Sequence, residues 1–117
     1  MIAIRGAITV KTNSEETINE ATKELLKTIL KSNNLKQEDL ISIIFSATND
    51  LNKQYPAVAA REIGLTDTPL FCVQEMNVEE SLNMCIRVLL HSNKNIDKDK
   101  VKHIYLKDAK KLRPDIR

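Results

Sequence analysis

Four of the five arginines in this 117-residue chain stand in apolar or small-residue surroundings, whereas the thirteen lysines mostly occupy solvated positions. Arginine carries a planar fork of donors that matches a carboxylate or phosphate, and it tolerates partial burial better than lysine. Several arginines in apolar settings therefore predict a small, fixed, anionic ligand. The four are Arg5 in a β-like run, Arg61 after a stretch of small residues, Arg87 inside the apolar run 85–90, and Arg113.

Three further side chains could take part in chemistry, and each also has an ordinary structural interpretation. Glu75 ends an apolar run, so it is either a strand-edge carboxylate in water or a positioned hydrogen-bond acceptor. A regular strand would put Cys72 and Glu75 on opposite faces, so the strand must bend or end between them if both line one pocket. Tyr105 alone is more often a core tyrosine, and Arg87 alone is equally well a partly buried surface arginine.

The chain offers no evident pair of nucleophile and general base. His91 and His103 are expected to be structural or exposed, no metal-ligand cluster is evident, and two glycines are too few for a phosphate-binding loop. A set of several arginines, one carboxylate, one thiol and one phenol suits binding of a compact polyanion. It also suits catalysis by positioning and electrostatics rather than by proton transfer.

The composition predicts one ordinary soluble domain over residues 1–117. Apolar residues make up 42% of the chain, charged residues 29% and aromatic residues 3%, and the net charge is +2. No basic block indicates nucleic-acid binding, and no apolar run is long enough to span a bilayer. The N-terminus has no signal-peptide pattern, and the two cysteines have no metal or redox spacing. We therefore expect a cytoplasmic protein with free thiols.

Periodicity and capping signals predict seven elements along the chain. The first helix is capped by Asn13–Ser14, has two glutamates in its first turn and ends at Asn33–Asn34, while Pro56 and Gly64 bound the short helix. The predicted elements are a strand at 2–10, a helix at 15–32, a strand at 40–47, a short helix at 56–64, a strand at 69–75, a second long helix at 78–91 and a strand at 101–106.

This order predicts an α/β or α+β fold in which a mixed sheet carries helices on one side. In the first strand Ile4 and Ile8 share one face, while Arg5 lies between Ala3 and Ala7 on the other, with room beside it. A sheet covered on one face only would leave its other face exposed. A closed cyclic oligomer could bury that face.

Eight short motifs, taken in order, resemble the monofunctional chorismate mutases of the trimeric α/β-barrel class. No single motif is specific, but the set spans nearly the whole chain in the right order. The motifs are Ile4-Arg5-Gly6-Ala7, Ser46-Ala47-Thr48-Asn49-Asp50-Leu51, Tyr55-Pro56-Ala57, Ala60-Arg61-Glu62, Cys72-Val73-Gln74-Glu75-Met76, Cys85-Ile86-Arg87-Val88, His103-Ile104-Tyr105-Leu106 and Leu112-Arg113-Pro114-Asp115.

The resemblance implies an isomerase of aromatic amino-acid biosynthesis that rearranges chorismate to prephenate without a cofactor or metal. It also implies a homotrimer, a pseudo α/β barrel, with active sites between subunits. By resemblance, Arg87, Glu75 and Cys72 carry the catalysis: Arg87 binds the ether oxygen and a carboxylate, and Glu75 with Cys72 holds the ring hydroxyl. The implied substrate-binding residues are Arg5 and Tyr105, then Tyr55, Ala57 and Arg61 from the neighbouring subunit, and Leu112 and Arg113 over the entrance.

A second hypothesis is a non-catalytic trimeric protein of the same fold that binds a small metabolite, because a fold alone does not fix a function. The complete set of Arg5, Cys72, Glu75, Arg87 and Tyr105 argues against it. A protein that bound a carboxylate metabolite but left chorismate unchanged would favour it.

Overall fold

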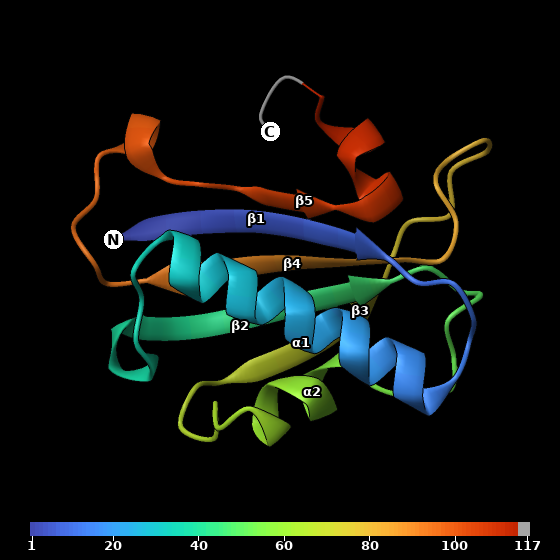
Figure 1. Ribbon diagram of the computed structural model, residues 1–117, viewed down its shortest axis with the longest axis horizontal. Helices are drawn as coiled ribbons and strands as arrows, with labels where there is room; N and C mark the ends of the chain where they lie inside the picture. Colours follow the sequence, from blue (N-terminus) through green and yellow to red (C-terminus); the bar gives the residue numbers. More distant parts are fainter. Residues whose placement is uncertain (115–117) are drawn as a thin grey trace.

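Five strands form one mixed sheet in the computed structural model, which describes residues 1–114 (Figure 1). The strand order is β3-β2-β4-β1-β5. Two α-helices and three short 3-10 helices complete the fold. The elements are β1 (Ile2–Thr9), α1 (Glu15–Ser32), η1 (Gln37–Asp39), β2 (Leu40–Ala47), α2 (Pro56–Glu62), β3 (Leu70–Gln74), β4 (Cys85–Ser92), η2 (Lys98–Lys100), β5 (Ile104–Leu106) and η3 (Lys107–Leu112).

The predicted long helix over residues 78–91 is wrong. Residues 78–84 form a loop, and β4 follows it as the central strand, antiparallel to both β1 and β2. In β4 the side chains alternate: Ile86, Val88 and Leu90 are buried, while Arg87 is exposed. An apolar run of this length fits either period, and here two long-range strand pairings decide the outcome.

The other predicted elements are present, with small differences at their ends. The second strand matches its prediction at both ends, and β1 and β3 are each shorter by one or two residues. The fifth strand is only three residues long, so half of the predicted strand at 101–106 lies outside the sheet. The first helix begins as predicted, because the Ser14 hydroxyl accepts the Thr17 N–H at 3.1 Å.

The short helix α2 begins at Pro56 as predicted and ends at Glu62, two residues before the predicted end. Pro56 occupies its first turn, and Gly64 follows its end with a φ of +99°, a left-handed conformation that favours glycine. The Gly64 N–H bonds to the Arg61 carbonyl, and the Leu65 N–H bonds to the Ala60 carbonyl. These bonds satisfy the last carbonyls of the helix and direct the chain toward β3.

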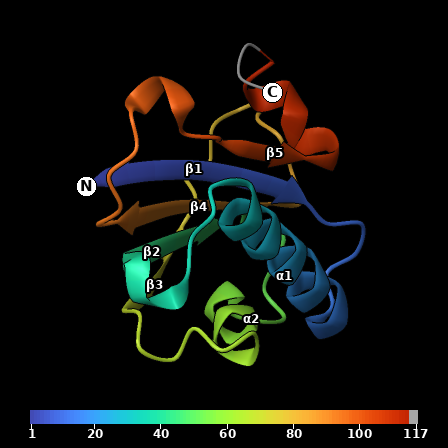
Figure 2. The same cartoon turned by 60° about the vertical axis from the view of Figure 1, so that its left-hand side comes forward.

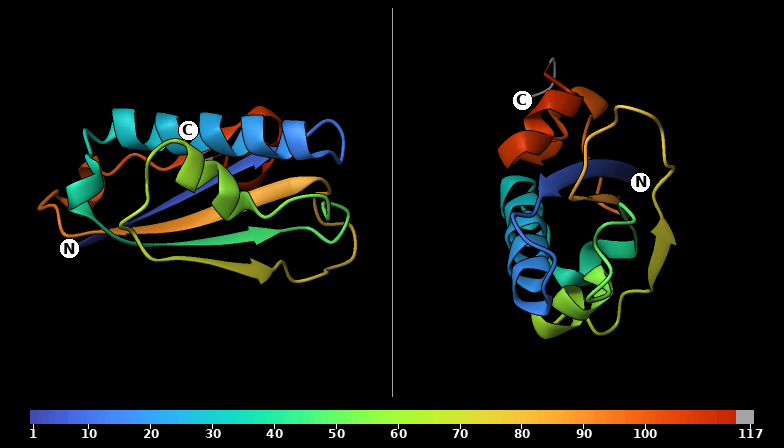
Figure 3. Two further views of the ribbon diagram at one scale, coloured as in Figure 1. Left: turned by 90° about the horizontal axis from the view of Figure 1, so that it is seen from below. Right: turned by 90° about the vertical axis from the view of Figure 1, so that its right-hand side faces the viewer.

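Both α-helices cover the same face of the sheet, as the edge-on view in Figure 3 shows. α1 packs against β1 and β5, and α2 packs against β2, β3 and α1. The main core lies between these layers and includes fully buried Ile4, Ile8, Phe45, Ile86 and Leu90. We call this side the helix face, and the opposite side of the sheet the open face.

The open face is covered at one end only. There η3 follows β5 at one end of the sheet (Figure 2). Buried Ala109 of η3 packs against Ala7 and Cys85. The η3 backbone is tied to β1, since the Asp108 N–H donates to the Thr9 hydroxyl at 3.1 Å. Among the described residues, no helix is long and apolar enough to cross a membrane. Asp115 of the last motif and the terminal Arg117 lie outside the described residues.

Candidate active site

On the open face, residues paired in register across all five strands form one row, which we call a level. Register pairing places Tyr105 beside Ala7, Ala7 opposite Arg87, Arg87 opposite Ser46, and Ser46 beside Val73. Neighbouring strands are roughly 4.8 Å apart, so the Tyr105 and Arg87 backbones are about 10 Å apart. Ala7 between them contributes only a methyl group. Ala7 is buried under Ala109 of η3, with the Tyr105 phenol on one side of it and the Arg87 guanidinium on the other.

Glu75 joins this level from the loop that follows β3. Its backbone N–H donates to the Ala47 carbonyl at 3.1 Å, which extends the sheet pairing by one residue. Its carboxylate accepts a hydrogen bond from the Ser46 hydroxyl at 2.5 Å and lies 3.6 Å from Nε of Arg87. The side chain of Arg87 is 47% exposed and that of Glu75 21%. An ion pair this exposed stabilises the fold by at most about 1 kcal/mol, so a ligand carboxylate can compete for Arg87.

A short loop after β2 fixes the start of β4 and therefore the position of Arg87. Both carboxylate oxygens of Asp50 accept the Met84 N–H, at 3.1 and 3.2 Å, and the Thr48 hydroxyl donates to the same carboxylate. The Cys85 N–H in turn donates to the Thr48 hydroxyl at 3.0 Å. Met84 has a φ of +51°, which is unfavourable for a non-glycine residue. Asp50 binds the backbone three residues before Arg87, and Thr48 binds it two residues before Arg87.

Cys85 lies on the open face two residues before Arg87, opposite Thr9, and is buried against Ala7 and Ala109 of η3. Burial raises the pKa of its thiol to about 11, and the nearby Arg87 guanidinium only partly offsets the increase. The thiol is therefore protonated at neutral pH. A buried, protonated thiol is not suited to act as a nucleophile.

Arg5 lies on the same face, one level along β1 from Ala7 and opposite Leu89 of β4. Its side chain is exposed, so it can reach a ligand above the sheet. The open face thus brings together four of the predicted site residues, namely Arg5, Glu75, Arg87 and Tyr105. Three of the four can bind a carboxylate, which matches the predicted anionic ligand.

The remaining predicted residues lie elsewhere in the chain. Cys72 pairs with Phe45 in register and faces the helix side, so it does not join Glu75. It lines a cleft of about 450 Å³ at the β3 edge together with Tyr55, Gln54 and Lys53. β3 ends at Gln74, between Cys72 and Glu75, and the alternation of the strand keeps these two side chains on opposite faces.

The residues of α2 follow Tyr55 in sequence, and α2 packs against β2 and β3. Ala57 is buried in the first turn of α2, and Arg61 is exposed in its last turn. Tyr55 precedes the helix and is 70% exposed, which is unusual for an aromatic side chain of this size. Tyr55 and Cys72 therefore form a second group at the β3 edge, and α2, which carries Ala57 and Arg61, packs against β2 and β3.

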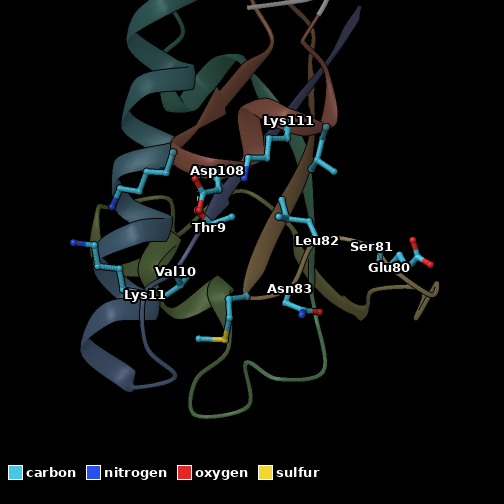
Figure 4. A pocket seen from close by; sticks show the side chains of 12 residues that line it. Thr9, Val10, Lys11, Glu80, Ser81, Leu82, Asn83, Asp108 and Lys111 are labelled. Carbon is cyan, nitrogen blue, oxygen red and sulfur yellow. Dashed lines mark hydrogen bonds between the residues drawn. The ribbon is translucent and has the colours of Figure 1, made fainter.

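Leu112 and Arg113 lie at the end of η3. Leu112 lines a groove of about 1040 Å³ between η3 and the loop at 80–84, next to the Tyr105 end of the open face. Figure 4 shows Thr9 and Asp108 on one wall of this groove and Leu82 across from them. Arg113 is half-buried and close enough to His103 to lower its pKa. The described part of the C-terminal segment therefore borders the open face.

Sequence reasoning missed four residues that build this site. Ser46 bonds Glu75, Thr48 and Asp50 hold the start of β4, and His103 bonds the backbone of Arg5. Ser46 offered a signal, because it is a polar residue in an otherwise apolar strand. Within residues 1–114, no three His, Cys, Asp or Glu side chains gather as metal ligands do.

Residues 1–116 match the sequence family described as chorismate mutase type I. The chain belongs to this family. It is 45% identical to a chorismate mutase AroH from Thermus thermophilus over 97% of this chain and 93% of that protein. It is 42% identical to a chorismate mutase AroH from Bacillus subtilis (strain 168), over 97% of this chain and 90% of that protein.

A solved structure of the same kind has the same fold. The chorismate mutase from Clostridium thermocellum superimposes with a TM-score of 0.94 at 47% sequence identity, covering 96% of this chain and all of that one. The resemblance read from the eight motifs is therefore confirmed at the level of family and fold. Each of these relatives is named for its catalytic activity, which does not favour the alternative of a non-catalytic binding protein.

Proposed function

We propose that this chorismate mutase converts chorismate to prephenate on the open face of the sheet, at a site completed by a neighbouring copy of the chain. The observation that carries the proposal is the single level that holds Tyr105, Ala7, Arg87 and Ser46, with Glu75 bonded into it. Family membership supplies the reaction, and the level supplies groups suited to a dianionic substrate. The product feeds aromatic amino-acid biosynthesis, and the proposed location is the cytoplasm.

The reaction is an intramolecular Claisen rearrangement, so it needs no cofactor and no covalent intermediate. One C–O bond breaks while one C–C bond forms, and negative charge grows on the departing ether oxygen. Arg87 donates to that oxygen and to a carboxylate. Because the charge is larger in the transition state than in chorismate, a fixed cation there lowers the barrier rather than merely tightening binding.

The other open-face groups hold the substrate in its compact, reactive conformation. Arg5 and Tyr105 bind a carboxylate from one side. Glu75 accepts the ring hydroxyl, since its second oxygen remains available beside the one that Ser46 and Arg87 share. Leu112 and Arg113 close the entrance from the η3 end.

The second group of residues completes the site only if it comes from another chain. Tyr55, Ala57, Arg61 and Cys72 lie at the β3 edge and cannot reach Arg87 across the sheet of their own chain. The neighbour's Cys72 thiol then meets the ring hydroxyl opposite Glu75. This differs from the expectation that one chain supplies Cys72 and Glu75 together.

The exposed apolar residues at this edge support an assembly of copies. Phe71 is 66% exposed and Val73 42%, and both lie on the open face of edge strand β3. Contiguous apolar surface of this kind marks an interface in most soluble proteins. A closed trimer is the proposed assembly, because three copies arranged in a ring bring each open face against the next β3 edge.

The test is to add purified protein to chorismate and follow its loss together with the appearance of prephenate. Two inactive variants then test the shared site: Arg87→Ala, and Tyr55→Ala combined with Arg61→Ala. Subunits of the two variants, unfolded together and refolded, form mixed trimers in which some interfaces join two intact halves. Activity should return in the mixture and not in either variant alone. A mixture as inactive as its components, with mixed trimers confirmed by mass, contradicts the shared site.

A further inference from the structure

A hydrogen bond to the side chain of His103 links the start of edge strand β5 to its neighbour β1. The Nδ1 of His103 accepts the backbone N–H of Arg5 at 3.0 Å, across 98 residues of sequence. The backbone pairing of β5 with β1 begins one residue later, at Ile104 and Gly6. The imidazole therefore extends the pairing of the two strands by one residue, using a side chain in place of a carbonyl.

The direction of this bond fixes the charge state of the ring. A backbone N–H can only donate, so Nδ1 must carry a lone pair and the ring proton must sit on Nε2. A doubly protonated imidazolium has no acceptor and cannot make the bond. The pairing of Arg5 with β5 thus requires neutral His103.

Both residues that this bond connects have a place in the proposed site. Arg5 carries its guanidinium on the open face, and Tyr105 of β5 lies two residues after His103, which directly precedes that strand. Because β5 has only three residues in the ladder, one additional bond at its start contributes appreciably to its register. The bond therefore helps to set the distance between the Arg5 guanidinium and the Tyr105 phenol, which bind the same substrate in the proposed function.

We propose that neutral His103 is a positioning residue, which holds the Arg5 guanidinium and the Tyr105 phenol at the spacing that the substrate needs. The proposal rests on the proposed function, in which those two groups bind a carboxylate. His103 itself does not touch the reacting atoms. It acts through the backbone of Arg5.

The charges around His103 keep it neutral under ordinary conditions. Burial lowers the pKa of its imidazole, and the Arg5 guanidinium from β1 and the Arg113 guanidinium after η3 lower it further. A small cavity of about 340 Å³ adjoins the ring, and its other titratable linings are His91 of β4, Lys98 of η2 and the terminal residue Met1. These groups are a histidine, a lysine and the N-terminal amine, and the described lining of the cavity includes no carboxylate.

The sign of the pH effect follows from the lowered pKa. The unfolded chain binds a proton at an ordinary histidine pKa of about 6.5, whereas the folded chain resists protonation until the pH is lower. Folding stability from this group is therefore complete above about pH 6.5 and is lost as the pH falls through the lowered pKa. Below it, the Arg5 bond breaks and a third cation appears beside two arginines.

Two substitutions distinguish the loss of the hydrogen-bond acceptor at position 103 from the loss of a group that titrates. His103→Asn keeps an acceptor, because Oδ1 of asparagine occupies nearly the place of Nδ1, but it does not titrate. His103→Leu keeps a similar volume without any acceptor. The measurement is kcat and KM for chorismate between pH 5 and pH 8 in the wild type and both variants.

At pH 7.5 the asparagine variant should exceed the leucine variant in kcat/KM by about tenfold, which corresponds to the loss of one hydrogen bond. As the pH falls from 6.5 toward the lowered pKa of His103, the wild type should lose activity more steeply than the asparagine variant. An asparagine variant with the same acid limb as the wild type, or a leucine variant with full activity at pH 7.5, would overturn the proposal.

A second readout does not depend on catalysis. The ¹⁵N shifts of the His103 ring at pH 7 should report a protonated Nε2 and an accepting Nδ1. The Arg5 amide should be protected from hydrogen exchange in the wild type and the asparagine variant and exchange faster in the leucine variant. If the protein left chorismate unchanged, these signals would still decide whether His103 holds the backbone of Arg5. A failure of the His103 proposal can therefore be told apart from a failure of the proposed function.

Discussion

The two faces of the sheet are built from the same strands but serve different ends. On the helix face, Ile4, Phe45, Ile86 and Leu90 are fully buried in a close-packed core. On the open face, the residues next to them in sequence are Arg5, Ser46 and Arg87. Alternation along a strand thus places a stabilising residue beside a functional one. Substitutions on the helix face should cost stability, and those on the open face should cost activity.

The largest expected effect is that of Arg87→Ala. Removing one preorganised donor from a developing oxyanion typically costs two to three orders of magnitude in kcat, and this donor also carries a full charge. We expect kcat to fall at least about a thousandfold, while the free energy of unfolding changes by less than about 0.5 kcal/mol, as is usual at exposed positions. Steady-state kinetics and urea unfolding of the same preparation measure both quantities.

Arg87→Lys is the matched control, because it keeps the charge and loses the fork of donors. It should remain far below the wild type. A near-normal turnover in the alanine variant would refute the role of Arg87, and full activity in the lysine variant would show that charge alone suffices.

The helix face should respond in the opposite way. Phe45→Ala removes the largest fully buried side chain of the core and should lower the free energy of unfolding by about 3–5 kcal/mol. The protein that remains folded should keep most of its kcat, since Phe45 faces away from the site. Urea unfolding and active-site titration in native buffer check these two expectations. A folded variant with a thousandfold lower kcat would contradict the separation of the faces.

Ser46→Ala changes the residue directly after Phe45 and tests the open face at a smaller scale. It removes the 2.5 Å hydrogen bond to Glu75, and a bond to a charged group contributes about 1.5–3 kcal/mol. We expect kcat/KM to fall by about tenfold or more, and the free energy of unfolding to fall by no more than about 1.5–3 kcal/mol, which is less than for Phe45→Ala. A loss of stability comparable to that of Phe45→Ala would show that this level of the open face is structural.

Cys85 is an exception to the contrast between the two faces, because it lies on the open face but is buried under η3. With a thiol pKa of about 11, only about one molecule in a thousand carries the reactive thiolate at pH 8. In a Cys72→Ser background, iodoacetamide at pH 8 should label the native protein very slowly and the urea-unfolded protein rapidly. Mass spectrometry gives both rates, and equal rates would mean that η3 opens readily.

Much of the fold could be predicted from local patterns. The Ser14 cap and the apolar period defined α1, Pro56 and Gly64 bounded α2, and the apolar run 40–47 gave β2. These signals depend on neighbouring residues alone, so the sequence contains them in full. The order of the eight motifs was likewise enough to place the chain in its family, which the comparisons confirm.

Tertiary structure alone decided the central strand and the composition of each face. An apolar run such as 85–92 fits a helix or a strand, and only pairing with β1 and β2 makes it β4. The bonds of Ser46 to Glu75 and of His103 to Arg5 join residues 29 and 98 positions apart. No local period encodes such contacts, because they form only when distant segments fold together. The residue types for anion binding are therefore in the sequence, while their common face is a product of the fold.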